Sequence, residues 1–455
     1  MANRIPLVVD GSNYRVEELP SGDTLDLNAA TVIGLNATGV STVSTLEASV
    51  LNVDATGIST IGILTGGIAI KGSTATDNTA GANNIAIGRS ASTLVGIMTG
   101  QNNIAIGWSS KYPALGGHDN VILGSEAGSN LTGPHVHSGP IGLTAEYNFL
   151  CLRAAGRDLT TGSRNVFIGL GAGAGVTTGN HNYCVGEDTM SLPASGGSGS
   201  NNIVLGDQAA RNLASGDGNV VIGKEAGKSN NGVGVSFTGD QNVIVGQQAG
   251  YIIRGGSYNI FTGPQAGIAA TSGNYNTGVG YRALYALTSG DTNTAIGSSA
   301  GLNITTGVNN TCIGLAAVVS SATTSNQVVL GNQYVTDLRC NVTTISAISD
   351  ARDKKDVVDL PIGLEFVNSL RPVKFEWDRR DGSMAGLKEA GFIAQELDAA
   401  QGAAGAEEYL RLVLKDNPDR LEASPGKLIP VLVKAIQELS VENSSLKARL
   451  DAAGL

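Results

Sequence analysis

The chain has 455 residues, which is long enough for two or more domains. Its 63 glycines are about twice the usual share, whereas aromatic residues make up only 4% of the chain. So few large side chains exclude a thick globular core over most of the length and favour thin, repetitive β structure. The net charge of −10 argues against a nucleic-acid-binding protein, which needs a basic surface.

The N-terminus has no apolar run long enough for a signal peptide, and no stretch approaches the roughly 18 apolar residues of a membrane span. We therefore expect no membrane insertion and folding in a cytoplasm. The cysteines are scattered, with no Cys-x-x-Cys spacing, so that neither a disulfide framework nor a zinc knuckle is expected. They are Cys151, Cys184, Cys312 and Cys340.

The first part of the chain divides into two segments. We interpret residues 1–27 as a head or attachment segment, with an ordinary turn and strand as the alternative. Residues 28–79 contain a short repeat, because the sequence from Ala37 to Val43 returns in similar form from Ala55 to Ile61. Its β-branched residues predict strands that cannot bury themselves alone. We expect a slender β stem in which three copies of the chain wind together.

A longer repeat fills residues 80–331. Each unit has Asn, three mostly apolar residues and Gly, with a small residue seven positions after the Asn. The spacing is 17 residues from Asn242 to Gln327, and 17 or more before that, so insertions interrupt the array without loss of register. The units begin at Asn84, Asn103, Asn120, Asn148, Asn165, Asn182, Asn202, Asn219, Asn242, Asn259, Asn276, Asn293, Asn310 and Gln327.

The physical chemistry of one unit predicts how the units stack. Three residues are extended, and glycine then makes a turn that most residues cannot adopt. Stacking aligns Asn on Asn, so that the amides form a ladder, and aligns Ile or Val on Ile or Val as a narrow core. The alternative, a disordered low-complexity tract, does not keep apolar residues in fixed register. The unit at Asn148 has Leu152 in place of glycine and is still counted as a coil.

Two units resemble a known repeat. Asn84–Gly88 and Asn103–Gly107 both read Asn-Ile-Ala-Ile-Gly, which is similar to the head repeat of YadA-like trimeric adhesins. The resemblance implies a left-handed parallel β-roll, or β-helix, with three chains side by side. The unit in this chain is longer than the common adhesin unit. Insertions are expected to emerge from the roll as loops.

Aromatic residues of the array are candidates for exposed positions that stack on sugars. The alternative is that they cap coils or pack between protomers. They are Trp108, Tyr112, Tyr251, Tyr258, Tyr275, Tyr281 and Tyr285.

The composition changes at Ser349. From there onward the chain has 15 Lys and Arg and 19 Asp and Glu, half of its 68 charged residues. This asymmetry marks a domain boundary. We interpret residues 332–348 as a short neck and residues 349–455 as a small α+β domain that ends in a helix.

This C-terminal domain resembles the self-cleaving intramolecular chaperone of phage tail spikes and fibres, peptidase S74. Four pieces in order carry the resemblance, from Ser349 to about Leu450. They are Ser349-Asp350-x-Arg352-x-Lys354-Lys355, Leu370-Arg371-Pro372-Val373-x-Phe375-x-Trp377, Gly391-Phe392-Ile393-Ala394-Gln395-Glu396 and Lys427-Leu428-Ile429-Pro430-Val431-Leu432. Asp353 departs from the pattern, which usually has an apolar residue there. The resemblance implies folding assistance and one self-cleavage beside Ser349, most simply at the Ser349–Asp350 bond.

The resemblance makes Ser349 and Lys354 the serine-lysine pair of that cleavage. A serine hydroxyl needs a base, and lysine can act as one when its neutral form is favoured by burial or by neighbouring cations. Arg352 would help in this way and Asp350 would oppose it. The alternative is that Asp350 and Arg352 only cap a helix or pair at the surface. No histidine follows His181 in the chain, so a Ser-His-Asp triad is not supported here.

The last helix, about residues 428–450, has apolar residues at alternating spacings of three and four. This pattern is typical of a coiled coil, with one asparagine as a polar residue that sets the register. The alternative is a stripe that packs on the helix's own domain. The predicted seam consists of Ile429, Leu432, Ile436, Leu439, Asn443, Leu446 and Leu450.

His135 and His137 lie in the longest insertion of the array. In trimeric phage fibres, such a pair from each of three chains can bind one metal ion, typically iron, on the symmetry axis. The alternative is a solvated loop. We expect no metal and no other cofactor.

Together these features predict a mostly β, homotrimeric phage tail fibre or related receptor-binding protein of the virion tail. Its expected partners are a phage tail or baseplate protein and a host receptor, either a polysaccharide or an outer-membrane protein. One alternative is a bacterial trimeric surface adhesin. The other is a tailspike depolymerase acting on polysaccharide, which needs paired carboxylates. The acids Glu126, Glu187, Asp188, Asp207 and Glu225 form no such motif.

Overall fold

The computed structural model describes residues 68–71, 85–88, 101–108, 118–128, 145–193, 196–229, 236–341, 347–380 and 382–454. The predicted head, most of the predicted stem, and His135 and His137 lie outside these residues. Within the described ranges, no helix has both the length and the apolar character needed to cross a membrane.

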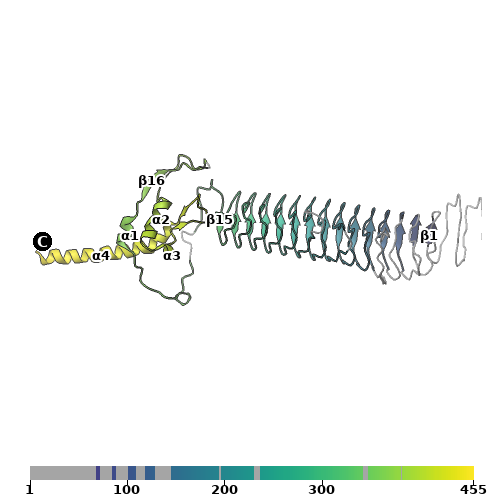
Figure 1. The fold of residues 1–455 in the computed structure, drawn as a ribbon, viewed down its shortest axis with the longest axis horizontal. Helices are drawn as coiled ribbons and strands as arrows, with labels where there is room; N and C mark the ends of the chain where they lie inside the picture. The colour runs from purple at the N-terminus through teal and green to yellow at the C-terminus, as the bar shows by residue number, and fades with distance from the viewer. Residues whose placement is uncertain are drawn as a thin grey trace, which may run out of the picture. The chain divides into compact units, whose positions relative to one another are not determined.

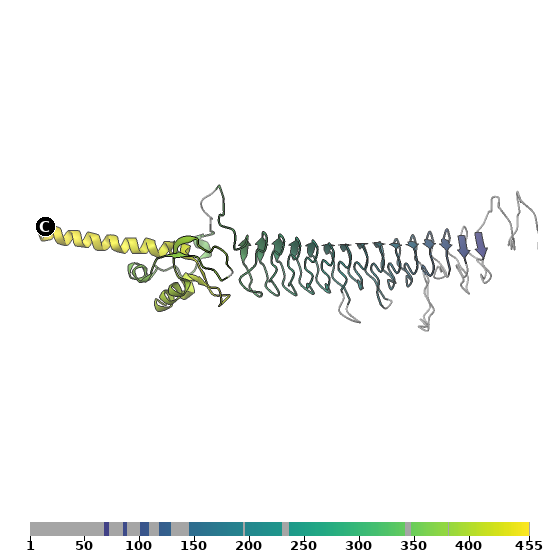
Figure 2. The ribbon, with the colours of Figure 1, turned by 90° about the horizontal axis from the view of Figure 1, so that it is seen from above.

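The repeat array forms one sheet of 15 parallel strands, which pair in sequential order (Figure 1). Figure 2 shows the strands along one side of the stacked coils and the returning chain on the other. The strands are β1 Ile68–Lys71, β2 Ile85–Gly88, β3 Ile104–Ile106, β4 Val121–Leu123, β5 Phe149–Cys151, β6 Val166–Ile168, β7 Tyr183–Val185, β8 Ile203–Leu205, β9 Val220–Ile222, β10 Val243–Val245, β11 Ile260–Thr262, β12 Thr277–Val279, β13 Thr294–Ile296, β14 Thr311–Ile313 and β15 Val328–Leu330. The predicted parallel β-solenoid is therefore confirmed.

The sheet starts earlier than residue 80. Strand β1 pairs with β2 so that Ile68 lies opposite Ile85. The unit of β1 has Gly67 in the position where later units have Asn, so the repeat is harder to recognise there. Part of the segment predicted as a separate stem thus belongs to the same sheet.

The predicted asparagine ladder runs through the described part of the array, and Asn259 shows its geometry. The backbone N–H and the side-chain amide of Asn259 both donate to Oδ1 of Asn242, at 2.9 and 3.1 Å. The same amide also donates to the carbonyl of Gly273, at 2.8 Å. The ladder asparagines are almost fully buried, and each interior one is bonded to the coils before and after it. Burial of these amides is therefore offset by hydrogen bonds.

The glycine that ends each strand brings neighbouring backbones into contact. Gly263 has φ +130°, and a Cβ atom there would lie 2.5 Å from the carbonyl oxygen of Gly280. Only glycine fits such a position without displacing the next coil. The unit at Asn148 is expected to form a coil although Leu152 stands in the place of its glycine. This expectation is confirmed, because β5 stays in the sheet and Leu152 adopts φ +82°.

The core contains only one of the three strand residues. The middle residue is buried, as Ile244 and Phe261 show, whereas the flanking residues face outward. Ile260 is 42% exposed and Ile296 is 44% exposed. The prediction that the stacked apolar residues of the strands form the core is therefore wrong for the first and third residue of each strand. Successive side chains of a strand point to opposite faces, so only the middle one points inward. The rest of the core comes from the returning chain, including Ile253, Leu284, Leu287 and Ile304.

The C-terminal region is a small body of short helices and strands followed by a long helix. Its elements are the short 3₁₀ turn η1 Ala351–Asp353, α1 Leu364–Ser369, β16 Val373–Glu376, β17 Lys388–Gly391, α2 Ala394–Ala403, α3 Glu407–Leu410, β18 Val413–Leu414, β19 Glu422–Ala423, η2 Pro425–Leu428 and α4 Ile429–Ala452. The small core includes Phe366 of α1, Leu397 of α2 and Val431 of α4. The predicted strand near Val373, the helix after Phe392 and the terminal helix are present.

Candidate self-cleavage site

The motif at Ser349 folds into a tight turn. Asp350 caps η1 by accepting a hydrogen bond from the backbone N–H of Arg352, at 2.9 Å. The Arg352 guanidinium also binds both carboxylate oxygens of Asp350, at 3.0 and 2.6 Å. The turn brings Lys354 back toward the start of the motif. Its Nζ donates to the Ser349 hydroxyl oxygen at 2.6 Å and to the Ser349 carbonyl at 3.4 Å.

The charged side chains beside Ser349 and Lys354 partly neutralise one another through ion pairs within the motif. The Arg352 guanidinium holds the pKa of the Asp350 carboxyl below its ordinary value, chiefly through the side-chain hydrogen bond. The same bond raises the pKa of Arg352. Lys355 lies 3.9 Å from Asp356, and both side chains are well exposed. The positive charge of Arg352 is thus offset by the Asp350 carboxylate within the turn.

The turn is exposed in the single chain. Ile348 is 95% exposed, and Lys354 also lies at the surface. A lysine accepts a proton from a serine only in its neutral form, which burial favours and contact with water does not. The 2.6 Å contact has the length that proton transfer between Ser349 and Lys354 would need, and in the single chain the turn is exposed. The capping and surface pairing of Asp350 and Arg352 are both present, and they shape the turn.

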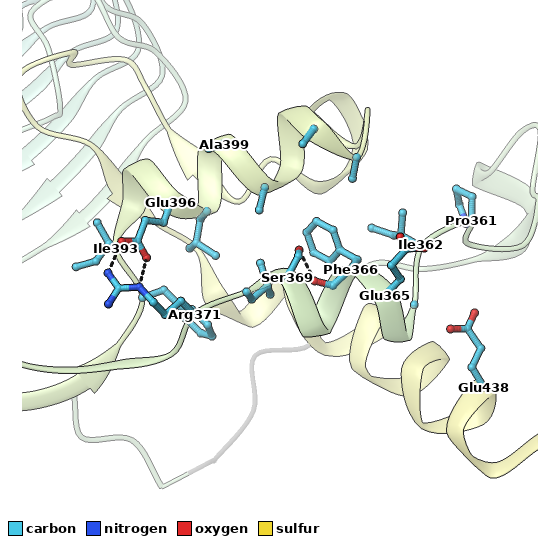
Figure 3. Close-up of a pocket in the computed structure, with 17 residues that line it drawn as sticks. Pro361, Ile362, Glu365, Phe366, Ser369, Arg371, Ile393, Glu396, Ala399 and Glu438 are labelled. Carbon is cyan, nitrogen blue, oxygen red and sulfur yellow. Dashed lines mark hydrogen bonds and ion pairs between the residues drawn. The ribbon is translucent and has the colours of Figure 1, made fainter. Parts of the chain in front are cut away.

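Two other pieces of the S74-like pattern meet through an ion pair. The guanidinium of Arg371 binds both carboxylate oxygens of Glu396, with Nε at 3.0 Å from Oε2 (Figure 3). This bond lowers the pKa of Glu396. The pair lies at one end of a groove of about 740 Å³ between α1 and α2, and Glu438 of α4 lies at the other end. Arg371 and Glu396 are 25 positions apart, and no spacing rule could have paired them from sequence.

Helix α4 uses one face for its own domain and leaves the predicted seam outside. Val431 and Ala435 are buried, and Glu438 accepts a hydrogen bond from the backbone N–H of Leu364 at 2.7 Å. The seam residues Ile436 and Leu439 are exposed. The alternative in which the stripe packs on its own domain is therefore not what the single chain shows. The exposed seam residues include Ile429, Leu432, Ile436, Leu439, Asn443, Leu446 and Leu450.

Three acids of the array, Glu126, Asp207 and Glu225, lie beside basic residues. No group of three or more His, Cys, Asp or Glu side chains among the residues that the structure describes could hold a metal ion. Glu225 is paired with Lys228 at 2.6 Å, and Asp207 lies 3.5 Å from Lys224. Glu126 lies 3.5 Å from Arg153. These acids are thus engaged in ion pairs with basic residues.

One link between two coils was not predicted from the sequence. His118 contacts an acid on each side, and we call these three residues, Asp119, His118 and Glu146, the histidine clamp. His118 Nδ1 lies 2.7 Å from Asp119 Oδ2, and its Nε2 lies 2.9 Å from Glu146 Oε1. The longest insertion separates His118 from Glu146 in the sequence, and the stacking of coils brings them together. The clamp thus ties the coil before the insertion to the coil after it.

Comparisons with known proteins bear on the C-terminal domain. Searches of curated proteins and of solved structures return no significant match. Residues 349–406 match the model of the family Peptidase S74, described as chaperone of endosialidase. The matched segment begins at Ser349, includes the turn with Lys354, and extends past Glu396. Together with the β-solenoid, this S74 chaperone domain supports a protein similar to tail fibres and tailspikes.

Proposed function

We propose that the chain is a homotrimeric phage tail fibre or tailspike-like protein that attaches the virion to its host. The observation that carries the proposal is an S74 domain, matched from Ser349, that follows a 15-stranded β-solenoid. The solenoid is the shaft, and it binds a host receptor. One end joins a phage tail or baseplate protein. The array's likeness to YadA-like repeats supports three solenoids side by side.

Two exposed apolar surfaces support the trimer. The outer face of the solenoid sheet presents Ile260, Ile296 and Ile313 to solvent, each more than 40% exposed. The seam of α4 presents a second apolar stripe at coiled-coil spacing. Contiguous apolar surface of this kind is typical of protein interfaces. Two further copies of the chain would cover both surfaces.

The same assembly supplies what the cleavage chemistry lacks. Trimerisation would bury the turn at Ser349 against neighbouring chains and favour the neutral amine of Lys354. The amine then takes the Ser349 proton, and the oxygen attacks the carbonyl carbon of the peptide bond that is cut, which gives an ester on Ser349. That amide bond breaks as the Lys354 ammonium returns its proton to the leaving nitrogen, and water then hydrolyses the ester to a carboxylic acid and the free hydroxyl. Cleavage would thus follow assembly and release residues 350–455.

The test is the intact mass and native size of the purified full-length chain beside its Ser349→Ala variant. We expect a trimer in both cases, with the wild-type chain split next to Ser349 and the variant whole. A trimeric but unsplit wild-type chain would keep the chaperone and remove the protease. A monomer at micromolar concentration would contradict the fibre proposal itself.

A further inference from the structure

A row of polar side chains crosses four successive coils on the returning side of the solenoid. It consists of the sixth residue after the ladder asparagine in each of four coils, namely Glu225, Gln248, Gln265 and Arg282, and the same position is also polar in the coil before, at Gln208, and in the coil after, at Ser299. We call these four residues the polar row. Successive coils place the members about 4.8 Å apart, the spacing of paired strands. All four are partly exposed.

Three members of the polar row are linked to one another. Gln248 Nε2 donates to Glu225 Oε2 at 2.9 Å, and Gln265 Nε2 lies 3.4 Å from Gln248 Oε1. Lys228 anchors the start of the chain by donating to Glu225 Oε1 at 2.6 Å. These contacts fix planar amide and carboxylate groups in a line, so little side-chain entropy is left to lose on binding.

Arg282 ends the row without an acidic partner. Its guanidinium carbon lies 4.1 Å from the ring centroid of Tyr285 and 5.9 Å from that of Tyr281. Among the described residues, no carboxylate is paired with it, and its buried Nε has no hydrogen-bond partner. The guanidinium is hydrogen-bonded to Tyr285 and Tyr281 and has no carboxylate beside it to neutralise its charge, so a carboxylate ligand would supply the missing counterion.

Tyrosines border the row. Tyr281 is 50% exposed beside Arg282, and Tyr251 lies near Lys228, whose Nζ is 5.7 Å from the Tyr251 ring centroid. Rings of this kind offer a flat apolar face with a polar tip. A line of planar hydrogen-bonding groups flanked by rings suits a chain of sugars, which presents hydroxyl groups at its edges and C–H groups on its faces.

We propose that the polar row and its tyrosines bind a linear acidic polysaccharide, with one sugar carboxylate on the Arg282 guanidinium. The proposal deepens the attachment role proposed above and rests on it. Each coil offers one hydrogen-bonding group, so that neighbouring sugars contact neighbouring coils. Arginine suits the carboxylate better than lysine does, because its planar fork matches both oxygens.

The experiment measures binding of the full-length trimer to oligosaccharides of one to eight sugars by calorimetry. The acidic probes are oligogalacturonates, oligomannuronates and oligosialates, and the neutral probe is a malto-oligosaccharide series. We expect binding to at least one acidic series and none to the neutral one. Affinity should rise with length to about four sugars and then level off, because the row spans four coils spaced as paired strands.

The array itself provides matched variants. Arg282→Gln repeats the residue found at the same position in two neighbouring coils, and we expect it to lower affinity at least about tenfold. Tyr281→Ser repeats the residue of the next coil, Ser298, and should also weaken binding. Tyr275→Thr repeats Thr292 on a different edge and should bind as the wild type does. Native size and melting temperature confirm that each variant is folded.

Three results would overturn the inference. They are no acidic series bound by the wild-type trimer, equal binding of the neutral series, and unchanged affinity in Arg282→Gln. A trimer that splits at Ser349 and binds none of the probes would sink this site and leave the proposed function standing. A monomeric chain would instead remove the proposed function first.

Discussion

The amino group of Lys354 lies 2.6 Å from the hydroxyl oxygen of Ser349, across a turn that Asp350 and Arg352 hold together. This contact is local, so each chain carries its own pair. The adjacent Lys355 lies on the same exposed turn, next to Asp356. The two lysines therefore form a natural comparison between a residue that contacts Ser349 and a neighbour that pairs with an acid.

We predict that Lys354→Gln abolishes self-cleavage and that Lys355→Gln retains it. Glutamine cannot accept the Ser349 proton, whereas Lys355 has no contact with the hydroxyl that would be lost. The measurement is the fraction of split chain over time, by denaturing electrophoresis of purified trimer. Equal cleavage in both variants would contradict the role given to Lys354.

The exposed stripe on α4 gives a second prediction. Ile436→Asn should dissociate the trimer, or raise its dissociation concentration at least about tenfold, because a polar residue would replace an apolar seam position. Val441→Asn is the control, since Val441 is 70% exposed and lies outside the seam. Sedimentation of both variants in the Ser349→Ala background decides the point. A trimer that is unaffected by Ile436→Asn would show that the seam is not an interface.

The asparagine ladder should be energetically coupled from coil to coil. Asn276→Ala removes the amide that bonds Asn259 and Gly290, and it leaves the backbone N–H of Asn293 without its acceptor. Each buried group left unbonded costs on the order of 1–3 kcal/mol, so we expect a loss of about 3 kcal/mol in the free energy of unfolding.

The control for that prediction is Asn309→Gly. Asn309 precedes a ladder residue, has φ +55° and makes an exposed contact with Asn326. Glycine adopts this backbone conformation readily, so the change should stay within about 0.5 kcal/mol. Denaturant unfolding compares the two variants. Equal losses in the free energy of unfolding would mean that a buried ladder asparagine contributes no more to stability than an exposed asparagine does.

The ion pair of Glu225 and Lys228 gives a pH dependence. The Lys228 ammonium and the Gln248 amide hold the pKa of the Glu225 carboxyl below its ordinary 4.5. Because this pKa is depressed in the folded state, the pair stabilises the fold fully above about pH 4.5. That stabilisation is lost as the pH falls through the lowered value.

Glu225→Gln should therefore destabilise the array at pH 7 and flatten its loss of stability in acid. We expect about 2 kcal/mol at pH 7, since the buried Lys228 would lose its carboxylate. Glu187→Gln, at an exposed position, should change neither quantity. The measurement is thermal unfolding between pH 3 and pH 7. An acid profile of Glu225→Gln that parallels the wild type would contradict this account.

The sequence predicts the solenoid well because its physics is periodic. A buried asparagine at a 17-residue spacing, with glycine at the end of each strand, defines the coil even where Leu152 breaks the rule. The start at Ile68 was missed because Gly67 removes the most visible residue of the repeat. The side chains that flank the middle residue of each strand point away from the core because the returning chain covers only the other face of the sheet. A run of three apolar residues does not reveal which face is covered.

The site is predicted where it is local. The resemblance to peptidase S74 names Ser349 and Lys354 as a pair, and the Asp350 cap explains how the turn brings them into contact. Contacts between distant segments, such as Arg371 with Glu396, depend on how helices and strands pack and have no signature in spacing. The same holds for His118 and Glu146, which neighbouring coils bring together across an insertion.

The constant register of the coils makes the length of the solenoid a modular quantity. From Asn242 onward every 17 residues add one strand, one ladder amide and one glycine contact of the same kind. Duplicating or deleting a whole coil therefore changes the length of the solenoid by about 4.8 Å and keeps the remaining coils in register. Recombination between repeats could tune this distance in single steps, without redesign of the domain that follows.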